Sequence, residues 1–338
     1  MTNTNALSGQ HVIVLGAGYA GLMRALQLAP HARVSLVEPG GHFTERIRSH
    51  ERAAGRPGIT HPLRGFLVPA GITHVPARVT AIAADAREIR TDDGGILHYD
   101  RLVYALGSRT AGLDVSTPGH VFTPESAAEL HKRLLDGHTP VGRTPARPGS
   151  LAVVGGGLTG IELAAEIAEA QPGWTVRLIT AGLVGAGLSG RRRDHVRRVL
   201  AARGVHLDEG HNIAAPDDVE TDVVVWAASM AARTGLAEAA GLAMSGGRIA
   251  VGPALRSVSH PGIYAAGDAA AAASPAVGQL RMACATALPT GMHAARSVLA
   301  DLRGAEPAPL RFRFRVQCVS LGRHDGLIQL ARRLVSAS

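Results

Sequence analysis

The chain has 338 residues, long enough for two domains with separate cores, and its 46% hydrophobic and 18% charged residues are typical of a globular α/β protein. The net charge of +8 comes almost entirely from arginine, because Lys132 is the only lysine, and aromatic residues make up only 3%. So few aromatic rings argue against a base-stacking surface, and we expect no nucleic-acid partner.

The first predicted elements are a strand over 11–15, a helix over 19–29 and a strand over 33–38. The ten residues before the first predicted strand lack the basic and apolar regions of a signal peptide. No apolar run approaches the length that spans a bilayer, so we expect a cytoplasmic protein without a firm membrane anchor.

A glycine fingerprint lies between the first strand and the first helix, at Gly16, Gly18 and Gly21. The first glycine permits a tight turn, the second lets a diphosphate approach the backbone, and the third lets helix and strand pack closely. Glu38 ends the next strand, where a carboxylate can accept hydrogen bonds from ribose hydroxyls. This unit therefore predicts a dinucleotide site.

The segment that follows is basic over 40–56 and then strand-like over 74–85, 87–93 and 96–106. Alternating hydrophobicity and a turn after Asp92 predict an inserted β-meander. A Pro- and Gly-rich stretch over 136–150 reads as a surface linker.

The same order of elements then recurs, with strands over 151–154 and 175–180, helices over 158–170 and 190–203, and a strand within 221–229. A second fingerprint, Gly155, Gly157 and Gly160, again separates strand from helix. Two fingerprints in this context are a strong signal for two dinucleotide sites. Thr180 stands where the first unit has Glu38, so the second site lacks the carboxylate that would repel a 2′-phosphate.

A third strand–turn–helix is predicted over 262–272, then a helix from about Cys284 to 304 and a basic tail. The order predicts a discontinuous first domain, 1–110 with 246–305, a second domain over 111–245, and a C-terminal interface segment over 306–338. Cys284 and Cys318 are 34 residues apart, so neither a dithiol centre nor a metal site is expected.

The five motifs GAGYAG, YDRLVYALGS, GGGLTGIELAAE, TDVVVWAAS and HPGIYAAGD, in this order, resemble the FAD-dependent pyridine nucleotide-disulfide oxidoreductase superfamily. The chain is most similar to the cysteine-free branch, the type II NADH dehydrogenase-like and apoptosis-inducing-factor-like flavoproteins. The resemblance covers roughly residues 10–325. It implies the glutathione-reductase-like fold, with two Rossmann-like domains and a short C-terminal segment.

The resemblance implies FAD at the first loop and NADH or NADPH at the second. The implied FAD residues are Gly16, Gly18, Tyr19, Ala20, Gly21, Glu38, Pro39, Arg46, Val79, Ala105, Gly107, Gly267 and Asp268. The implied NAD(P)H residues are Gly155, Gly157, Leu158 and Gly160. Asp268 would hold the ribityl hydroxyls, with an ordinary helix cap as the alternative.

The resemblance also implies that Glu162 lies near the reacting rings; a glutamate that only serves the helix dipole is an equal alternative. Disulfide reductases pair this glutamate with a lysine beside the flavin, and here Arg46 or Arg48 is the substitute, although both also fit a solvated basic face. His50 is a weaker candidate, and Cys284 reads as a packing residue rather than a redox thiol.

Several positions depart from the family pattern. Leu106 replaces the threonine of the usual ATG triplet, and Ser229 replaces the glycine that usually follows WAA. Arg191, Arg192 and Arg193 can contact a 2′-phosphate or simply begin a solvated helix. CATALPTG stands where type II NADH dehydrogenases carry a glutamine-rich quinone motif.

These observations predict an FAD-dependent oxidoreductase that transfers a hydride from NAD(P)H to flavin and then reduces a small acceptor. The alternative is an FAD-dependent tailoring oxidase or dehydrogenase that acts on a small organic substrate and keeps a vestigial NAD(P) site. A redox-sensing or nucleic-acid-associated flavoprotein is a third reading, which would show salt-sensitive binding to duplexes. A homodimer is expected only by analogy with the family.

Overall fold

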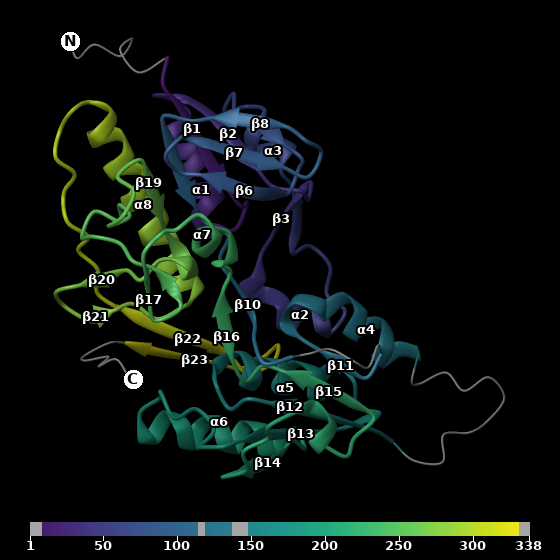
Figure 1. The fold of residues 1–338 in the computed structure, drawn as a ribbon. Helices are drawn as coiled ribbons and strands as arrows, with labels where there is room; N and C mark the ends of the chain where they lie inside the picture. The colour runs from purple at the N-terminus through teal and green to yellow at the C-terminus, as the bar shows by residue number, and fades with distance from the viewer. Residues whose placement is uncertain (1–8, 114–118, 137–147, 331–338) are drawn as a thin grey trace.

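The structure, a computed structural model, describes residues 9–113, 119–136 and 148–330. It contains two five-stranded parallel sheets, one above the other in Figure 1, and each has a fingerprint strand at its centre. The mixed α/β fold with two Rossmann-like sheets is therefore confirmed. Residues 137–147 of the predicted linker over 136–150 lie outside the described residues, as do both ends of the chain, whereas its last two residues already belong to a strand, Gly149–Val154.

The first sheet has the strand order β19-β9-β1-β2-β5. Its inner strands β1 and β9 are largely apolar and buried on both faces, as is usual where helices cover a parallel sheet. Its strands and covering helices are β1 (His11–Leu15), β2 (Arg33–Val37), β5 (Thr73–Val75), β9 (Arg101–Tyr104), β19 (Ile263–Ala265), α1 (Tyr19–Leu28) and α8 (Cys284–Leu302).

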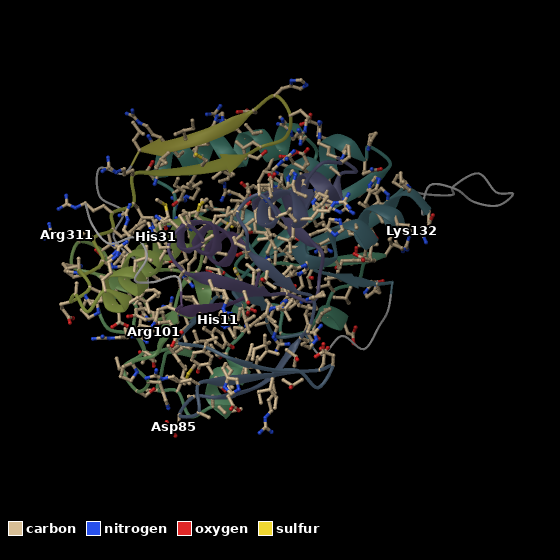
Figure 2. The ribbon with its side chains drawn as sticks, turned by 90° about the horizontal axis from the view of Figure 1, so that it is seen from above. His11, His31, Asp85, Arg101, Lys132 and Arg311 are labelled. Carbon is tan, nitrogen blue, oxygen red and sulfur yellow. The ribbon has the colours of Figure 1, made fainter. Side chains whose placement is uncertain are left out.

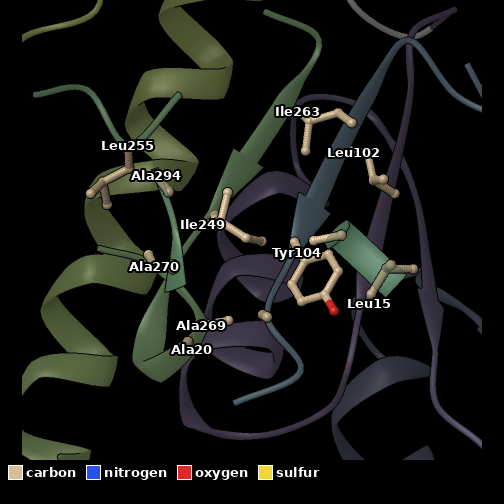
Figure 3. Close-up of a cluster of buried hydrophobic side chains, with 14 of the residues drawn as sticks. Leu15, Ala20, Leu102, Tyr104, Ile249, Leu255, Ile263, Ala269, Ala270 and Ala294 are labelled. Carbon is tan, nitrogen blue, oxygen red and sulfur yellow. The ribbon is translucent and has the colours of Figure 1, made fainter. Parts of the chain in front are cut away.

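Helices α1 and α8 pack closely against each other, because a Cβ at Gly291 would lie only 2.8 Å from the carbonyl oxygen of Ala20. Figure 3 shows the adjoining core, where Leu15 of β1 and Leu102 and Tyr104 of β9 lie in one cluster with Ile249. The Tyr104 hydroxyl donates to the carbonyl of Arg233 at 2.7 Å, so this buried polar group is satisfied.

The first sheet is built from two parts of the chain, because β19 and α8 follow the whole second sheet in sequence. The exact domain boundaries given above stay predictions. The meander appears as the antiparallel sheet β6-β7-β8, while the last strand-like segment divides between β8 and β9. The smaller elements here are β3 (His42–Thr44), β4 (Thr60–Pro62), β6 (Val79–Ala83), β7 (Glu88–Thr91), β8 (Ile96–His98), α2 (Ser49–Ala53) and α3 (Arg64–Leu67).

The second sheet has the strand order β11-β15-β12-β13-β14. Its central strand β12 precedes the second fingerprint, and α5 follows it. The members of this unit are β11 (Val121–Phe122), β12 (Gly149–Val154), β13 (Trp174–Thr180), β14 (His206–Glu209), β15 (Val223–Trp226), α4 (Ala127–Asp136), α5 (Leu158–Ala170) and α6 (Gly190–Ala202).

Two antiparallel crossing strands, β10 (Ser108–Thr110) and β16 (Met230–Ala232), connect the two units. The C-terminal segment forms a hairpin, β22 (Val316–Ser320) and β23 (Gly326–Leu330), that packs against α5 and α6. In Figure 1 the hairpin lies between the two large sheets. The remaining elements are α7 (Gly235–Ala239), β17 (Met244–Ser245), β18 (Arg248–Ile249), β20 (Ala273–Ser274) and β21 (Gly278–Gln279).

The helix predicted at the end of the strand–turn–helix over 262–272 is wrong. The strand forms as β19, but a single 3-10 turn, Gly267–Ala269, follows it, and the chain then extends into β20. Ala269, Ala270 and Ala272 are buried in the core, so tertiary packing overrides the helix propensity of the alanine run.

Candidate functional site

The first glycine loop is built by contacts that no side chain would tolerate. Gly16 has φ +92°, its N–H donates to the carbonyl of Val37 at 2.9 Å, and a Cβ there would lie 2.7 Å from the carbonyl oxygen of Ala105. A Cβ at Gly21 would lie 1.9 Å from the carbonyl oxygen of Gly16. The turn and the helix packing therefore both require glycine.

The second loop repeats this construction bond for bond. Gly155 has φ +126°, its N–H donates to the carbonyl of Ile179 at 2.8 Å, and a Cβ there would lie 2.6 Å from the carbonyl oxygen of Ala227. A Cβ at Gly160 would lie 1.9 Å from the carbonyl oxygen of Gly155. The two predicted nucleotide loops thus share one backbone design.

The middle glycines differ from the others because the space beside them is open. A Cβ at Gly18 or at Gly157 would meet no atom within 4 Å among the described residues. Each is the extended residue immediately before its helix, α1 or α5. Open space at a helix N-terminus is where a diphosphate meets the free N–H groups.

Glu38 lies at the carboxyl end of β2, beside the first loop. Its Oε2 accepts a hydrogen bond from the N–H of Ala17 at 3.1 Å, and its Oε1 accepts one from Gly40 at 3.3 Å. These bonds fix the carboxylate while leaving lone pairs for ribose hydroxyls. Pro39 follows it, and Val79 lies buried at the start of β6.

Asp268 has a buried carboxylate oxygen without a partner. Its Oδ2 accepts a hydrogen bond from the Ser108 hydroxyl at 2.6 Å, while its Oδ1 is buried and has no hydrogen-bond partner among the described residues. Because no α-helix follows the 3-10 turn, Asp268 does not serve as an α-helix cap. An orphaned acceptor here fits a bound hydroxyl group, such as those of the FAD ribityl chain.

Arg46 and Arg48 separate in the structure. Arg46 Nη1 donates to the carbonyl of Ser108 at 2.9 Å, so it joins the group around Asp268. Arg48 instead donates through Nε and Nη2 to Glu51, at 3.0 and 2.8 Å. Of the two predicted substitutes for the family lysine, only Arg46 contacts this group.

Tyr19 and Cys284 begin α1 and α8, next to the same region. The Tyr19 ring packs edge-to-face on Phe43 with centroids 5.2 Å apart, and burial raises the pKa of its hydroxyl to about 12. Burial also raises the pKa of the Cys284 thiol. A protonated, partly buried thiol agrees with the packing role predicted for it.

A cavity of about 340 Å³ lies at the second loop. Its lining residues are Gly156, Gly157, Leu158, Thr180, Gly182, Leu183, Gly185, Ala186, Gly187, Arg281 and Gln317. A Cβ at Gly156 would lie 2.7 Å from Thr180 Oγ1, so the loop passes directly over the strand end. The three arginines 191–193 are in the first turn of α6 and are not among the described residues that line it.

Glu162 lies on α5, mostly buried between α2 and the C-terminal hairpin. Its Oε1 accepts a hydrogen bond from the Ser320 N–H at 3.1 Å, and its Oε2 lies 3.9 Å from His50 Nδ1. Burial raises the pKa of Glu162 to about 7 and lowers the pKa of His50. Glu162 is therefore partly protonated and His50 is neutral near neutral pH.

Three contributors to these sites were missed by sequence reasoning. Ser108 links Arg46 to Asp268, and only its place at the end of the YALGS motif could have identified it. Arg281 and Gln317 line the second cavity but belong to no motif. Ser229, which replaces the glycine that usually follows WAA, donates its hydroxyl to the carbonyl of Ala111 at 3.0 Å in the crossing segment.

The site has two Rossmann-like units with the same glycine-loop construction, a glutamate at the end of β2 beside the first loop, and, after β19, an aspartate with an oxygen that has no partner among the described residues. This combination defines a class of proteins. It is the class of flavoproteins that hold FAD and a nicotinamide nucleotide on one chain. The model of the pyridine nucleotide-disulphide oxidoreductases matches residues 10–294, and the chain belongs to this family.

Relatives and solved structures agree with this assignment. An NADH dehydrogenase-like protein of Mycobacterium tuberculosis is 32% identical, over 92% of this chain and 85% of the relative. A type II NADH:quinone oxidoreductase of Staphylococcus saprophyticus is 27% identical, over 94% of this chain and 88% of the relative. NDH2 from Plasmodium falciparum in complex with NADH shares the fold, with a TM-score of 0.80 at 14% identity over 96% of this chain and 90% of that one.

The family confirms that the chain is an oxidoreductase with FAD and NADH or NADPH as its cofactors. No helix among the described residues is long and apolar enough to cross a membrane. The individual site residues, the cytoplasmic location and the homodimer stay predictions.

Proposed function

We propose that this chain is an NAD(P)H dehydrogenase that binds FAD at the first loop and NADH or NADPH at the second, and reduces a small-molecule acceptor. The observation that carries the proposal is the shared construction of the two loops, each with open space at its middle glycine. FAD, when bound, accepts the hydride of the nicotinamide and passes the electron pair on.

The residues of the first site have separable tasks in this proposal. The N-terminus of α1 and open Gly18 bind the diphosphate, Glu38 holds the adenosine ribose, and Asp268 Oδ1 accepts a ribityl hydroxyl. Arg46 holds the strand that carries Ser108 against this aspartate. These groups orient the ring system rather than exchange protons with it.

Glu162 has the protonation state for proton exchange during reduction of the acceptor. Its carboxyl group titrates near neutral pH, so it can hold or release a proton at Oε2, where His50 Nδ1 lies 3.9 Å away. A two-electron reduction of an organic acceptor by NAD(P)H takes up one proton overall. Glu162 is our candidate for that uptake.

Anaerobic reduction of the purified holoprotein tests the proposal. NADH or NADPH, added in stoichiometric amount, should remove the oxidised-flavin absorbance near 450 nm (about one equivalent per chain). A flavin that responds to an organic substrate but to neither nucleotide would support the tailoring oxidase instead. A flavin that stays oxidised with both nucleotides rules the proposal out.

A further inference from the structure

The cavity at the second loop has walls from three distant parts of the chain. Gly156–Leu158 and the 182–187 segment belong to the second Rossmann-like unit. Arg281 precedes α8 of the first unit, and Gln317 lies on β22 of the C-terminal hairpin. Arg281 is the one charged side chain among the described residues that line it.

Arg281 is held in place by its neighbours. Its Nη2 donates to Gln317 Oε1 at 3.1 Å, and its guanidinium lies over the Phe314 ring, 4.8 Å from the centroid. Arg313 and Arg315, which flank this ring in sequence, are exposed like Arg281, but they are not among the described residues that line the cavity. Figure 2 shows Arg311 of the same series at the surface.

Gln317 is itself fixed by the hairpin. It pairs with Gln329 across β22 and β23, and both glutamines are nearly buried, at 5% and 6% exposure. Gln329 Oε1 accepts a hydrogen bond from the Ser189 N–H at 3.1 Å, just after the 182–187 wall. The hairpin therefore braces the guanidinium and the opposite wall of one cavity.

The positive charge in the cavity favours an anionic ligand. A fixed guanidinium faces the space at the N-terminus of the 13-residue helix α5, where Gly157 leaves room. A helix N-terminus and an arginine both favour an anion with several oxygens. In a dinucleotide that group is the diphosphate.

We propose that Arg281, positioned by Gln317, binds the diphosphate of NADH or NADPH across the cavity from the α5 N-terminus. This inference rests on the proposed function, because it takes the second loop as the NAD(P)H site. It adds that the site is completed by a residue of the FAD-binding unit and by the C-terminal hairpin.

Binding to the oxidised holoprotein tests the inference without turnover. ADP-ribose is the probe, because it carries the diphosphate and no nicotinamide, and calorimetric titration gives its Kd. R281A should raise this Kd roughly 10- to 100-fold, the range for a hydrogen bond to a charged group. R281K should recover part of the loss, and Q317A should weaken binding by a smaller factor than R281A.

R313A is the matched control, because Arg313 is an equally exposed arginine of the neighbouring segment that does not line the cavity, and its loss should leave the Kd unchanged. FAD content and circular dichroism check that each variant folds. If wild type binds ADP-ribose and R281A, R281K and Q317A all bind it equally well, the role of Arg281 is overturned while the proposed function stands. If wild type binds neither ADP-ribose nor NADH nor NADPH, both are overturned.

Discussion

His50 Nδ1 and Glu162 Oε2 lie 3.9 Å apart, yet the two residues do not form an ion pair at neutral pH. Burial moves both titrations toward the neutral forms, because it raises the pKa of Glu162 to about 7 and lowers that of His50. The contact therefore joins a neutral imidazole to a carboxyl group that loses its proton within the physiological pH range.

The raised pKa of Glu162 predicts a pH-dependent cost in stability. The pKa of Glu162 in the folded protein, about 7, lies above its ordinary value of 4.5. Protonation of Glu162 therefore stabilises the folded protein at low pH, and this stabilisation is lost as the pH rises through 7. E162Q removes the titration and should gain stability over wild type between pH 5 and 8, by up to about 3 kcal/mol at pH 8.

Thermal melting of the holoproteins at fixed FAD concentration across this pH range measures the gain. E306Q is the control, because Glu306 is 84% exposed and its replacement should leave the pH profile unchanged. An E162Q advantage that stays constant with pH would contradict the assigned titration.

Replacing the third glycine of each loop by alanine should impair a different cofactor in each case. A Cβ at Gly21 or Gly160 would overlap a carbonyl oxygen at 1.9 Å, a backbone clash that costs on the order of 4 kcal/mol. G21A should therefore be purified with little FAD, whereas G160A should keep its FAD but fail to respond to NAD(P)H.

Flavin content per chain and anaerobic titration measure the two defects separately. G65A is the control, because Gly65 lies in α3 and a Cβ there would meet no described atom within 4 Å. Full FAD retention by G21A, or full nucleotide response by G160A, would show that the loops do not have these roles.

The orphaned oxygen of Asp268 predicts a loss of FAD affinity. If Oδ1 accepts a ribityl hydroxyl, D268A should raise the Kd of the apoprotein for FAD roughly 10- to 100-fold. S108A removes only the internal bond to Oδ2 and should cost less. Quenching of FAD fluorescence on titration gives both constants, and equal losses in the two variants would contradict the assignment.

The sequence predicted both Rossmann-like units because their signals are local. Strand, glycine spacing and helix follow one another within about twenty residues, and the structure differs at these boundaries by one or two residues. The helix prediction within 262–272 was wrong because the conformation of this segment depends on long-range packing. Its alanines favour a helix locally, but their burial against the first sheet decides their conformation.

The site residues also divide into those with a local sequence signal and those placed by long-range packing. Glycines, Glu38 and Asp268 stand in motifs, whereas Arg281 and Gln317 reach the second cavity only through the packing of a hairpin. Their sequence separation of 36 residues carries no periodic signal. The same limit applies to Ser320, whose backbone N–H holds Glu162 from the far end of the chain.

The residue at position 180 is expected to affect discrimination between NADH and NADPH. It lines the cavity at the end of β13, where an acidic side chain would face the adenosine ribose and repel a 2′-phosphate. T180E should therefore weaken NADPH binding about tenfold or more, because like charges in contact are costly, and should affect NADH much less. T180Q introduces a side chain of the same size as that of T180E but without its charge. It therefore separates the effect of crowding against Gly156 from that of charge repulsion of the 2′-phosphate. Dissociation constants of both nucleotides for the three proteins decide the matter. A T180E that loses NADH and NADPH by the same factor as T180Q would place the ribose elsewhere.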